Sequence, residues 1–502
     1  MRLISLLSST VAFASFVSAK LPALAQCGSA DIAAIPCATG HICAALNTTY
    51  SHCISNLRSG TAAARATRRG EIEKRDGEGG QLNILNGTPF KFVLESKNSY
   101  QLNAWDLPAE IGPFSSASAY VEFKTGFLVS TGDDGGEAHY RIDGTDSNFE
   151  IQARGDGGFR LQTVFTGLST PNNPQGSTLH LGWQHDGAVN FVLSGTDAGS
   201  FISSNAPENW MTLALPTFGD TPLGKFVLPA SHDSGMSKLD GNTAGSTECN
   251  TLTQSFNVRD QLSRGARYFD IRPVISAGNY KAGHYSQISV DAIGLETAQG
   301  GNGESIDDMV NGINDFQKDK SELIILNLSH DFNTDVGNSE YRGLNQDEWN
   351  ALFEKLKGIN NLYVSEKEDT KLTDLPLKAF IGEHSAVVIV VESGGANLDG
   401  IRGKGFFTYD QLGPYNNYSD SDDLNSMVDD QLQKMRDHAG EYMLLSWTLT
   451  QKVPAVFLCP AAPSIRELGD KANAALFARI LNESNKDAYP SSSTLTSSRA
   501  EI

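Results

Sequence analysis

Short apolar runs and amphipathic stripes alternate along the chain from about residue 213 onward. Six runs have the length and composition of buried strands: FVL (226–228), GARYFDI (265–271), ELIILNL (322–328), AVVIVV (386–391), GFFTY (405–409) and YMLLSW (442–447). Alternation of strands and helices over about 270 residues predicts a TIM-type (β/α) barrel, a fold of typically about 250 residues. Six strands are recognised where eight are needed, so the predicted barrel is irregular.

Two segments between these runs predict helices with one apolar face. The stripes are Met309, Val310, Ile313 and Phe316, and Trp349, Leu352, Phe353 and Leu356. The first stripe follows a capping box in SIDD (305–308), and the second stops at Gly358. We expect both stripes to belong to the hydrophobic core rather than to a ligand site.

Between Gln81 and about Trp210 the pattern is one of short β-type runs separated by Gly, Asp, Asn and Pro turns. The runs span residues 90–94, 119–123, 126–129, 138–142, 149–153, 159–164 and 189–193. This spacing predicts an all-β, sandwich-like domain. Trp105 and Trp183 are interpreted either as buried core aromatics, the commoner arrangement, or as part of a surface that contacts glycan or lipid.

The N-terminal residues have the form of a secretory signal. MRLISLLSSTVAFASFVSA (1–19) combines one Arg, an apolar run and a small-residue end, so the mature chain is expected to begin near Lys20, outside the cell. A membrane anchor is disfavoured because Ser8, Ser9 and Thr10 interrupt the run, and no later run reaches the roughly 18 apolar residues of a spanning helix. The tail SSSTLTSSRAEI lacks an apolar lipid-anchor signal and predicts disorder.

The predicted organisation therefore has six parts. They are a signal peptide (1–19), a Cys-rich module (20–58), a flexible linker (59–80), the β-sandwich-like domain (81–212), the barrel (213–490) and a disordered tail (491–502). The linker contains Lys74-Arg75, which is either a dibasic processing site or a solvated charge pair.

Cysteine usage agrees with an oxidising compartment. Cys27, Cys37, Cys43 and Cys53 lie close together and predict two disulfides of open connectivity, whereas Cys249 and Cys459 are isolated. A zinc site is the weaker interpretation, because the spacing departs from the usual Cys-x2–4-Cys pattern.

Net charge of −20 and a pI near 4.9 disfavour nucleic acid as a partner and offer no general attraction to anionic membranes. Four Asn-x-Ser/Thr sequences predict glycosylation, at Asn47, Asn86, Asn417 and Asn482. A fifth, at Asn327, closes a predicted strand and is expected to be inaccessible.

Polar side chains gather at the ends of successive predicted strands. VLPASHD offers His232 and Asp233, YFDIRP offers Asp270 and Arg272, and YKAGHYSQ offers His284. Adjacent Ser231, His232 and Asp233 cannot form a catalytic triad by themselves, because neighbouring side chains of an extended segment point apart.

Two imidazoles and a guanidinium suit phosphoryl transfer. One histidine can take a proton from an attacking hydroxyl while the other protonates the leaving oxygen, and the guanidinium neutralises charge on the phosphate. A second Ser-His-Asp trio makes His330 a weaker candidate.

The motifs LPASHDSGM, GARYFDIRP and GHYS resemble the X domain of phosphatidylinositol-specific phospholipase C, of the bacterial, metal-independent type also found in secreted fungal proteins. The resemblance covers roughly residues 213–490. It implies that His232 is the general base, that His284 is the general acid assisted by Asp233, and that Arg272 binds phosphate with support from Asp270. It implies no metal and no cofactor, because Arg272 stands where calcium-dependent relatives have an acidic ligand.

The chain departs from that family at three places. Ser329 or His330 stands where the family has a lysine, and Glu392-Ser393 where bacterial members have an arginine for the sugar ring. The family's last strand carries an aspartate that braces the general base, whereas residues 491–502 read as a low-complexity tail. We therefore expect an open barrel and weak activity.

The sequence thus predicts a secreted phosphoric diester hydrolase with a phospholipid or glycosyl-phosphatidylinositol substrate at a membrane surface. The alternative is a weakly active or inactive secreted protein that binds glycan or lipid through its β domain. Another barrel phosphodiesterase, acting on glycerophosphodiesters or sphingolipids, is a third interpretation, but it usually needs a metal-binding carboxylate set that these motifs lack.

Overall fold

The computed structural model describes residues 26–29, 41–47, 50–55, 77–485, 488–490 and 492–495, with gaps at 127–128, 186, 244–245, 291–294, 338–340 and 453–462. The chain divides into two compact units, Met1–Arg75 and Asp76–Ile502. In the first unit, β1 (Gln26–Ser29), β2 (His41–Asn47) and β3 (Tyr50–Ser55) form an antiparallel sheet in the order β1-β3-β2. The predicted signal peptide, dibasic site and disulfide pairing of the module lie outside the described residues.

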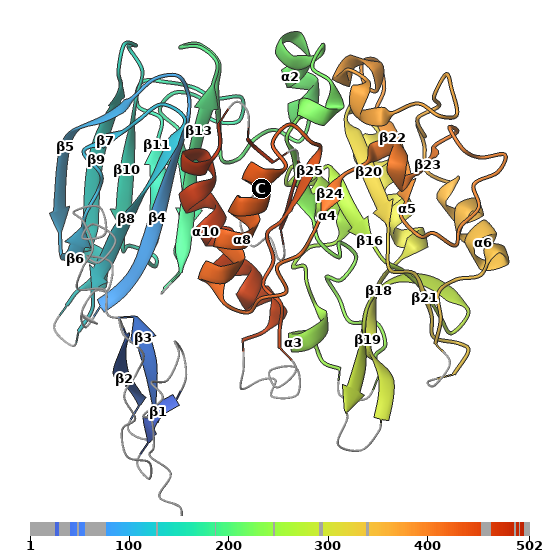
Figure 1. Cartoon of the computed structure of the whole chain (residues 1–502). Coiled ribbons are helices and arrows are strands. Elements are labelled where there is room, and N and C mark those ends of the chain that lie inside the picture. Colours follow the sequence, from blue (N-terminus) through green and yellow to red (C-terminus); the bar gives the residue numbers. More distant parts are fainter. Residues whose placement is uncertain are drawn as a thin grey trace, which may run out of the picture. The chain divides into compact units, whose positions relative to one another are not determined.

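The second unit begins with two packed sheets (Figure 1). One contains β5 (Phe92–Tyr100), β7 (Glu110–Ile111), β9 (Gly135–Ile142), β10 (Asn148–Arg154), β11 (Arg160–Val164) and β12 (Thr178–Gly182). The other contains β4 (Gly77–Gly87), β6 (Leu102–Trp105), β8 (Ser115–Lys124), β13 (Ala188–Gly195) and β14 (Phe201–Ser203). Alternate residues of both sheets meet in one apolar core, the arrangement expected of a sandwich.

One local prediction in this region is wrong. The linker was expected to extend to residue 80, but residues 77–80 already belong to β4, whose backbone pairs with β8 from Gly77 onward. The predicted run at 126–129 includes residues 127–128, which lie outside the described residues. Glycine-rich and charged composition concealed the start of β4, since neither feature carries an alternating apolar pattern.

Trp105 lies in the sandwich core with 6% of its surface exposed, and its indole N–H donates to the Glu137 carbonyl. Trp183 packs edge-on against Phe123. Both tryptophans therefore pack with the core. Contact of the β domain with glycan or lipid stays a prediction.

The remainder of the second unit is built on an eight-stranded parallel sheet of the TIM-barrel type. In chain order the strands are β15 (Leu228–Ser231), β16 (Tyr268–Ile271), β20 (Leu323–Leu328), β22 (Ala386–Val391), β23 (Phe406–Thr408), β24 (Tyr415–Asn416), β25 (Met443–Ser446) and β26 (Ser492–Leu495). Their spatial order is β23-β22-β20-β16-β15-β26-β25-β24. Six of them are the six predicted strands. Among the described residues no pairing joins β23 to β24, so the sheet does not close by hydrogen bonds.

The prediction that residues 491–502 form only a disordered tail is wrong for 492–495. These residues form β26, which pairs in parallel with β15 on one side and with β25 on the other. The sequence SSTL has no apolar run to mark it as a strand, and the strand is defined by backbone pairing with its two neighbours. The barrel therefore extends past Pro490, and the opening in the sheet lies between β23 and β24.

Helices surround this sheet, some on its outer face and some at its ends. They are α2 (Trp210–Phe218), α3 (Glu248–Thr251), α4 (Val258–Ser263), α5 (Ile306–Gln317), α6 (Gln346–Leu356), α7 (Tyr409–Leu412), α8 (Leu424–Asp437) and α10 (Ile465–Glu483). The two predicted apolar stripes are buried faces of α5 and α6, and the Ser305 hydroxyl caps α5 by accepting from the Asp308 N–H.

Helix α10 lies between the sandwich and the parallel sheet (Figure 1). On one side, the Ser116 hydroxyl donates to the Ala478 carbonyl, and the Asn83 amide donates to the Ala474 carbonyl. On the other side, the indole of Trp447 donates to the Ala472 carbonyl. The helix thus accepts hydrogen bonds from the sandwich through its backbone carbonyls, and it packs Leu468, Ala472 and Leu476 against β25.

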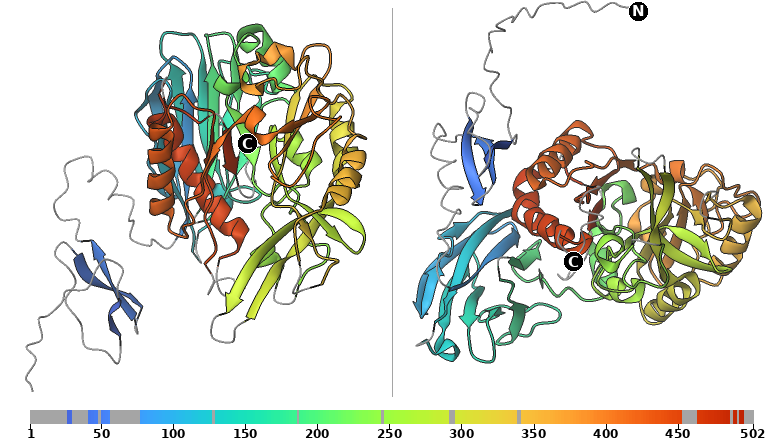
Figure 2. Two further views of the ribbon diagram at one scale, coloured as in Figure 1. Left: turned by 45° about the vertical axis from the view of Figure 1, so that its right-hand side comes forward. Right: turned by 90° about the horizontal axis from the view of Figure 1, so that it is seen from below.

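A second small sheet stands at the carboxyl end of the parallel strands. It contains β17 (Pro273–Ser276), β18 (Asn279–Val290), β19 (Leu295–Ser305) and β21 (Phe332–Asn333). Figure 2 shows the β18–β19 hairpin extending away from the parallel sheet. Because β17 and β18 are joined by a tight turn, the chain that leaves β16 returns at once to the same strand end.

We predict that Ser493→Pro destabilises the protein by about 1–3 kcal/mol, the cost of leaving one buried backbone group of the ladder unsatisfied. The midpoint of thermal unfolding should fall by several degrees. Ser493→Ala, which keeps the N–H, should stay within about 0.5 kcal/mol of the parent chain. Equal unfolding temperatures for the proline variant and the parent would show that β26 is not part of the folded sheet.

Candidate active site

The side chains of the candidate site lie at the carboxyl ends of the parallel strands, on the face that points into the barrel. The interior rows are Leu228 and Ala230 in β15, Tyr268 in β16, Leu323 and Ile325 in β20, and Ala386, Val388 and Val390 in β22. Alternate residues of a strand share a face, so the same rows reach His232, Asp270, Asn327 and Glu392 at the carboxyl ends. The intervening residues of these strands pack instead under α4, α5 and α6.

The turn after β15 is fixed by side chains from the segment around α3 and α4. The Gln254 amide donates to the His232 carbonyl at 2.6 Å, and the Thr253 hydroxyl donates to the Asp233 carbonyl at 2.8 Å. Asp233 has a φ of 46°, a left-handed conformation that is uncommon for a residue with a side chain. Its own N–H donates to Asp270 Oδ2 at 3.1 Å. The turn is therefore held by its surroundings in a shape that directs Asp233 away from His232.

Asp233 pairs with the second histidine. Its fully buried carboxylate lies 2.6 Å from His284 Nδ1. His284 reaches this position because β18 runs back along β17, and the Gly283 N–H donates to the Arg272 carbonyl. The sequence neighbours Ser231, His232 and Asp233 thus have separate partners, since the Ser231 hydroxyl donates to Gln261 outside the barrel.

Arg272 lies between the two buried carboxylates. Its Nε and Nη2 donate to Asp270 Oδ2 at 3.2 and 3.1 Å, and its Nη1 lies 3.7 Å from Asp233 Oδ2. Burial alone would raise the pKa of Asp270, but the Arg272 charge and a hydrogen bond from the Ser329 hydroxyl outweigh burial and hold that pKa well below its usual range. The two carboxylates likewise raise the pKa of Arg272 against the effect of burial. Asp270 and Arg272 are therefore both charged.

His232 is held neutral beside this cation. Arg272 Nη2 donates to His232 Nε2 at 2.9 Å, so Nε2 is the acceptor nitrogen and the ring proton resides on Nδ1. Burial and the Arg272 charge lower the pKa of His232 from 6.5 to about 4. His232 Nδ1 is buried and has no hydrogen-bond partner among the described residues. The orientation of this ring is thus fixed on one side only.

The ring of Tyr418 packs edge-on against His232, with centroids 5.7 Å apart. His330 is exposed, and its Nδ1 lies 2.9 Å from the Ser329 hydroxyl. His330 therefore contacts the site only through Ser329, which itself donates to Asp270.

All five residues singled out from the sequence come together: His232, Asp233, Asp270, Arg272 and His284. Their catalytic roles stay predictions. Sequence reasoning missed Thr253 and Gln254, which come from an irregular segment with no periodic signal, and assigned Tyr418 only to a glycosylation sequence. Of the sequences predicted to be glycosylated, Asn86 is fully buried and its amide donates to three backbone carbonyls, so it is inaccessible as folded.

Two kinds of feature are absent from the described residues. No three His, Cys, Asp or Glu side chains in that part of the chain gather in a way that could hold a metal ion. No helix there is both long and apolar enough to cross a membrane.

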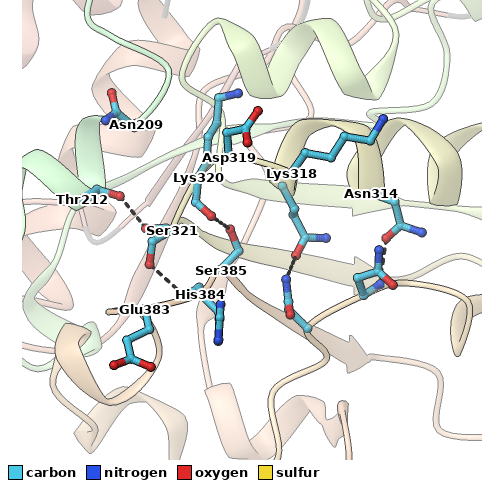
Figure 3. A pocket seen from close by; sticks show the side chains of 13 residues that line it. Asn209, Thr212, Asn314, Lys318, Asp319, Lys320, Ser321, Glu383, His384 and Ser385 are labelled. Carbon is cyan, nitrogen blue, oxygen red and sulfur yellow. Dashed lines mark hydrogen bonds between the residues drawn. The ribbon is translucent and has the colours of Figure 1, made fainter.

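A pocket of about 590 Å³ lies at the opposite end of the parallel strands, before β20 and β22 (Figure 3). Its hydroxyl groups bond within the protein: Ser321 donates to the Gly382 and His384 carbonyls, and Ser385 donates to the Lys320 carbonyl. The pocket contains none of the residues that form the candidate site.

No model of a known protein family matches the sequence. Among solved structures, the chain is similar to bacterial phosphatidylinositol-specific phospholipases C. It aligns with a mutant of the Staphylococcus aureus protein at 16% identity and a TM-score of 0.41, over 59% of this chain and 93% of that one. It aligns with the Listeria monocytogenes protein at 16% identity and a TM-score of 0.37, over 58% and 93%. The roles that we propose for the site residues rest on the geometry of the site.

We predict that Arg272→Gln raises the pKa of His232 above about 4, because it removes a cation from the ring and leaves two carboxylates uncompensated. Burial keeps the value below 6.5. The measurement is an NMR titration of the His232 ring in the parent and variant. Arg479→Gln on α10 removes the same charge elsewhere and should leave the pKa unchanged. An unchanged pKa in Arg272→Gln would contradict the electrostatic coupling.

Proposed function

We propose that the chain is a secreted phosphoric diester hydrolase with chemistry like that of phosphatidylinositol-specific phospholipase C, cleaving a phosphoinositide-type phosphodiester at a membrane surface. One observation carries the proposal: a neutral histidine, His232, and a carboxylate-paired histidine, His284, lie on either side of a buried guanidinium. The apolar N-terminal segment supports the extracellular location.

Arg272 is the phosphate ligand in this proposal. A bound phosphodiester competes with His232 for the guanidinium, because its anionic oxygens accept charge-assisted hydrogen bonds that a neutral imidazole matches poorly. When Arg272 turns to the phosphate, the lone pair of His232 Nε2 becomes available. His232 can then take a proton from the headgroup hydroxyl that attacks phosphorus, and burial together with the Arg272 charge keeps the ring neutral until substrate binds.

His284 is the general acid. Its Nδ1 donates to Asp233, so in the imidazolium form Nε2 carries the proton that goes to the leaving oxygen of the lipid alcohol. The P–O bond to that alcohol breaks as the bond from the headgroup oxygen forms, and a cyclic phosphate results. Asp233 orients the ring and stabilises its positive charge.

Asp270 supports Arg272 without touching substrate. It accepts from the guanidinium, from the Asp233 N–H and from Ser329, so one carboxylate sets the position of both the phosphate ligand and the turn that carries Asp233.

A weakly active binding protein is the second candidate function, and His232 Nδ1 favours it. A general base whose second nitrogen has no partner among the described residues lacks the hydrogen bond that would fix its ring. In serine proteases, loss of the carboxylate that sets the histidine tautomer lowers turnover by about 10⁴. Here Arg272 fixes the tautomer from the other side before substrate binds, so we expect a smaller loss.

We predict that His232→Ala and His284→Ala each lower phosphodiesterase activity by roughly 10²–10⁴-fold, the usual contribution of a general acid or base. Release of water-soluble phosphate from labelled phosphatidylinositol is the assay, with thermal unfolding to show that each variant folds. His384→Ala, at the opposite end of the strands, is the matched control and should keep full activity. Parent-like rates in both site variants would disprove the assignment.

We also predict that activity survives strong chelation, because Arg272 supplies a fixed positive charge at the phosphate. The parent protein is assayed with phosphatidylinositol before and after dialysis against a chelator, and again with added calcium. The rate should change less than twofold. Loss of activity that calcium restores would contradict the role given to Arg272.

A further inference from the structure

Glu392 follows β22 and is half-buried at the carboxyl end of the barrel. Asn327 Nδ2 donates to its Oε2 at 2.8 Å. Within the described part of the chain, Glu392 forms no ion pair. The proposed mechanism gives this carboxylate no role, so its presence near the proposed phosphate ligand Arg272 needs a separate explanation.

The strand register gives the distance from Glu392 to the phosphate ligand. Ile271, Leu328 and Val391 are paired across β16, β20 and β22, so Arg272, Ser329 and Glu392 follow them in the next layer. Neighbouring strands lie about 4.8 Å apart, which puts the backbone of Glu392 roughly 10 Å from that of Arg272. A headgroup of one six-membered ring, held at Arg272 through its phosphate, can therefore reach Glu392.

The groups around Glu392 carry no positive charge. Asn327 is 3% exposed, and its Oδ1 is buried without a partner. Burial and the Glu392 charge both raise the pKa of Tyr409 and of Tyr418, which places the two phenols near the carboxylate. Arg272 does not offset this charge, because Asp233 and Asp270 already balance it.

We propose that Glu392 and Asn327 form a subsite for an ammonium group carried by the headgroup of the phosphodiester. An ammonium donates to the carboxylate, whose position Asn327 fixes through its own hydrogen bond. A neutral polyol satisfies the same acceptors less strongly, and a phosphorylated polyol is repelled by Glu392. The position of the phosphate in this inference rests on the proposed function.

The kinetic test uses phosphatidylinositol and a synthetic analogue in which a ring hydroxyl distant from the reacting one is replaced by an amine. The N-acetyl form of the analogue has nearly the same shape without the charge. In the parent protein at pH 7, the amine should be cleaved with a kcat/KM at least roughly tenfold above that of the N-acetyl form, since hydrogen bonds to charged groups contribute this much or more.

Three variants locate the effect. Glu392→Gln keeps an acceptor for Asn327 and should reduce the amine-to-acetyl ratio to about one. Glu392→Asp should retain part of the preference. Glu383→Gln, an exposed carboxylate beside the pocket at the other end of the strands, changes net charge equally and should leave the ratio at its parent value.

A binding measurement separates this inference from the proposed function. Calorimetry with the soluble aminodeoxyinositol 1-phosphate and its N-acetyl form should give the same tenfold ratio of Kd values in the parent and none in Glu392→Gln. A tenfold ratio of Kd values without cleavage of any lipid would contradict the proposed hydrolase function and support the subsite. Cleavage of phosphatidylinositol with amine-to-acetyl ratios near one in both measurements would contradict the subsite and support the hydrolase function. Failure of both ligands to bind would overturn the subsite.

Discussion

The guanidinium of Arg272 is the charge on which the rest of the site depends. Asp233 is fully buried and Asp270 nearly so, and two carboxylates removed from water in this way are sustained only by a cation and by hydrogen bonds. Asp270 in turn accepts the N–H of Asp233, and Asp233 holds His284. The positions of His284, the turn after β15 and Arg272 are thus coupled through Asp270 and Asp233, and none of them is set independently.

The same coupling explains why His232 is neutral. A guanidinium can only donate, so its contact with Nε2 excludes a proton on that nitrogen. Glu392 differs from Asp233 and Asp270 in having no ion pair within the described part of the chain. The charges at the strand ends are therefore more nearly balanced around Arg272 than toward β22.

Sequence patterns predicted the parts of the fold that are buried on a regular period. β16, β20 and β22 are continuous apolar runs, and α5 and α6 have clear stripes, because burial on a fixed face requires them. β24 has two residues and β26 reads SSTL, so neither carries a periodic signal, and both are defined by pairing with strands distant in the sequence. The five site residues were found because each lies in or just after a recognisable strand or hairpin. Thr253, Gln254 and Tyr418 were missed as site residues, since only tertiary structure brings their irregular segments to His232.

β26 also has a consequence for how the protein is made. β15 is the first strand of the parallel sheet to be synthesised, yet its partner on one side is the last. A nascent chain on the ribosome therefore carries β15 with one unpaired edge until β26 has emerged, a long-range pairing of the kind that slows folding and invites aggregation. Because His232 and Asp233 follow β15 directly, the strand that positions them gains its second neighbour only at that point.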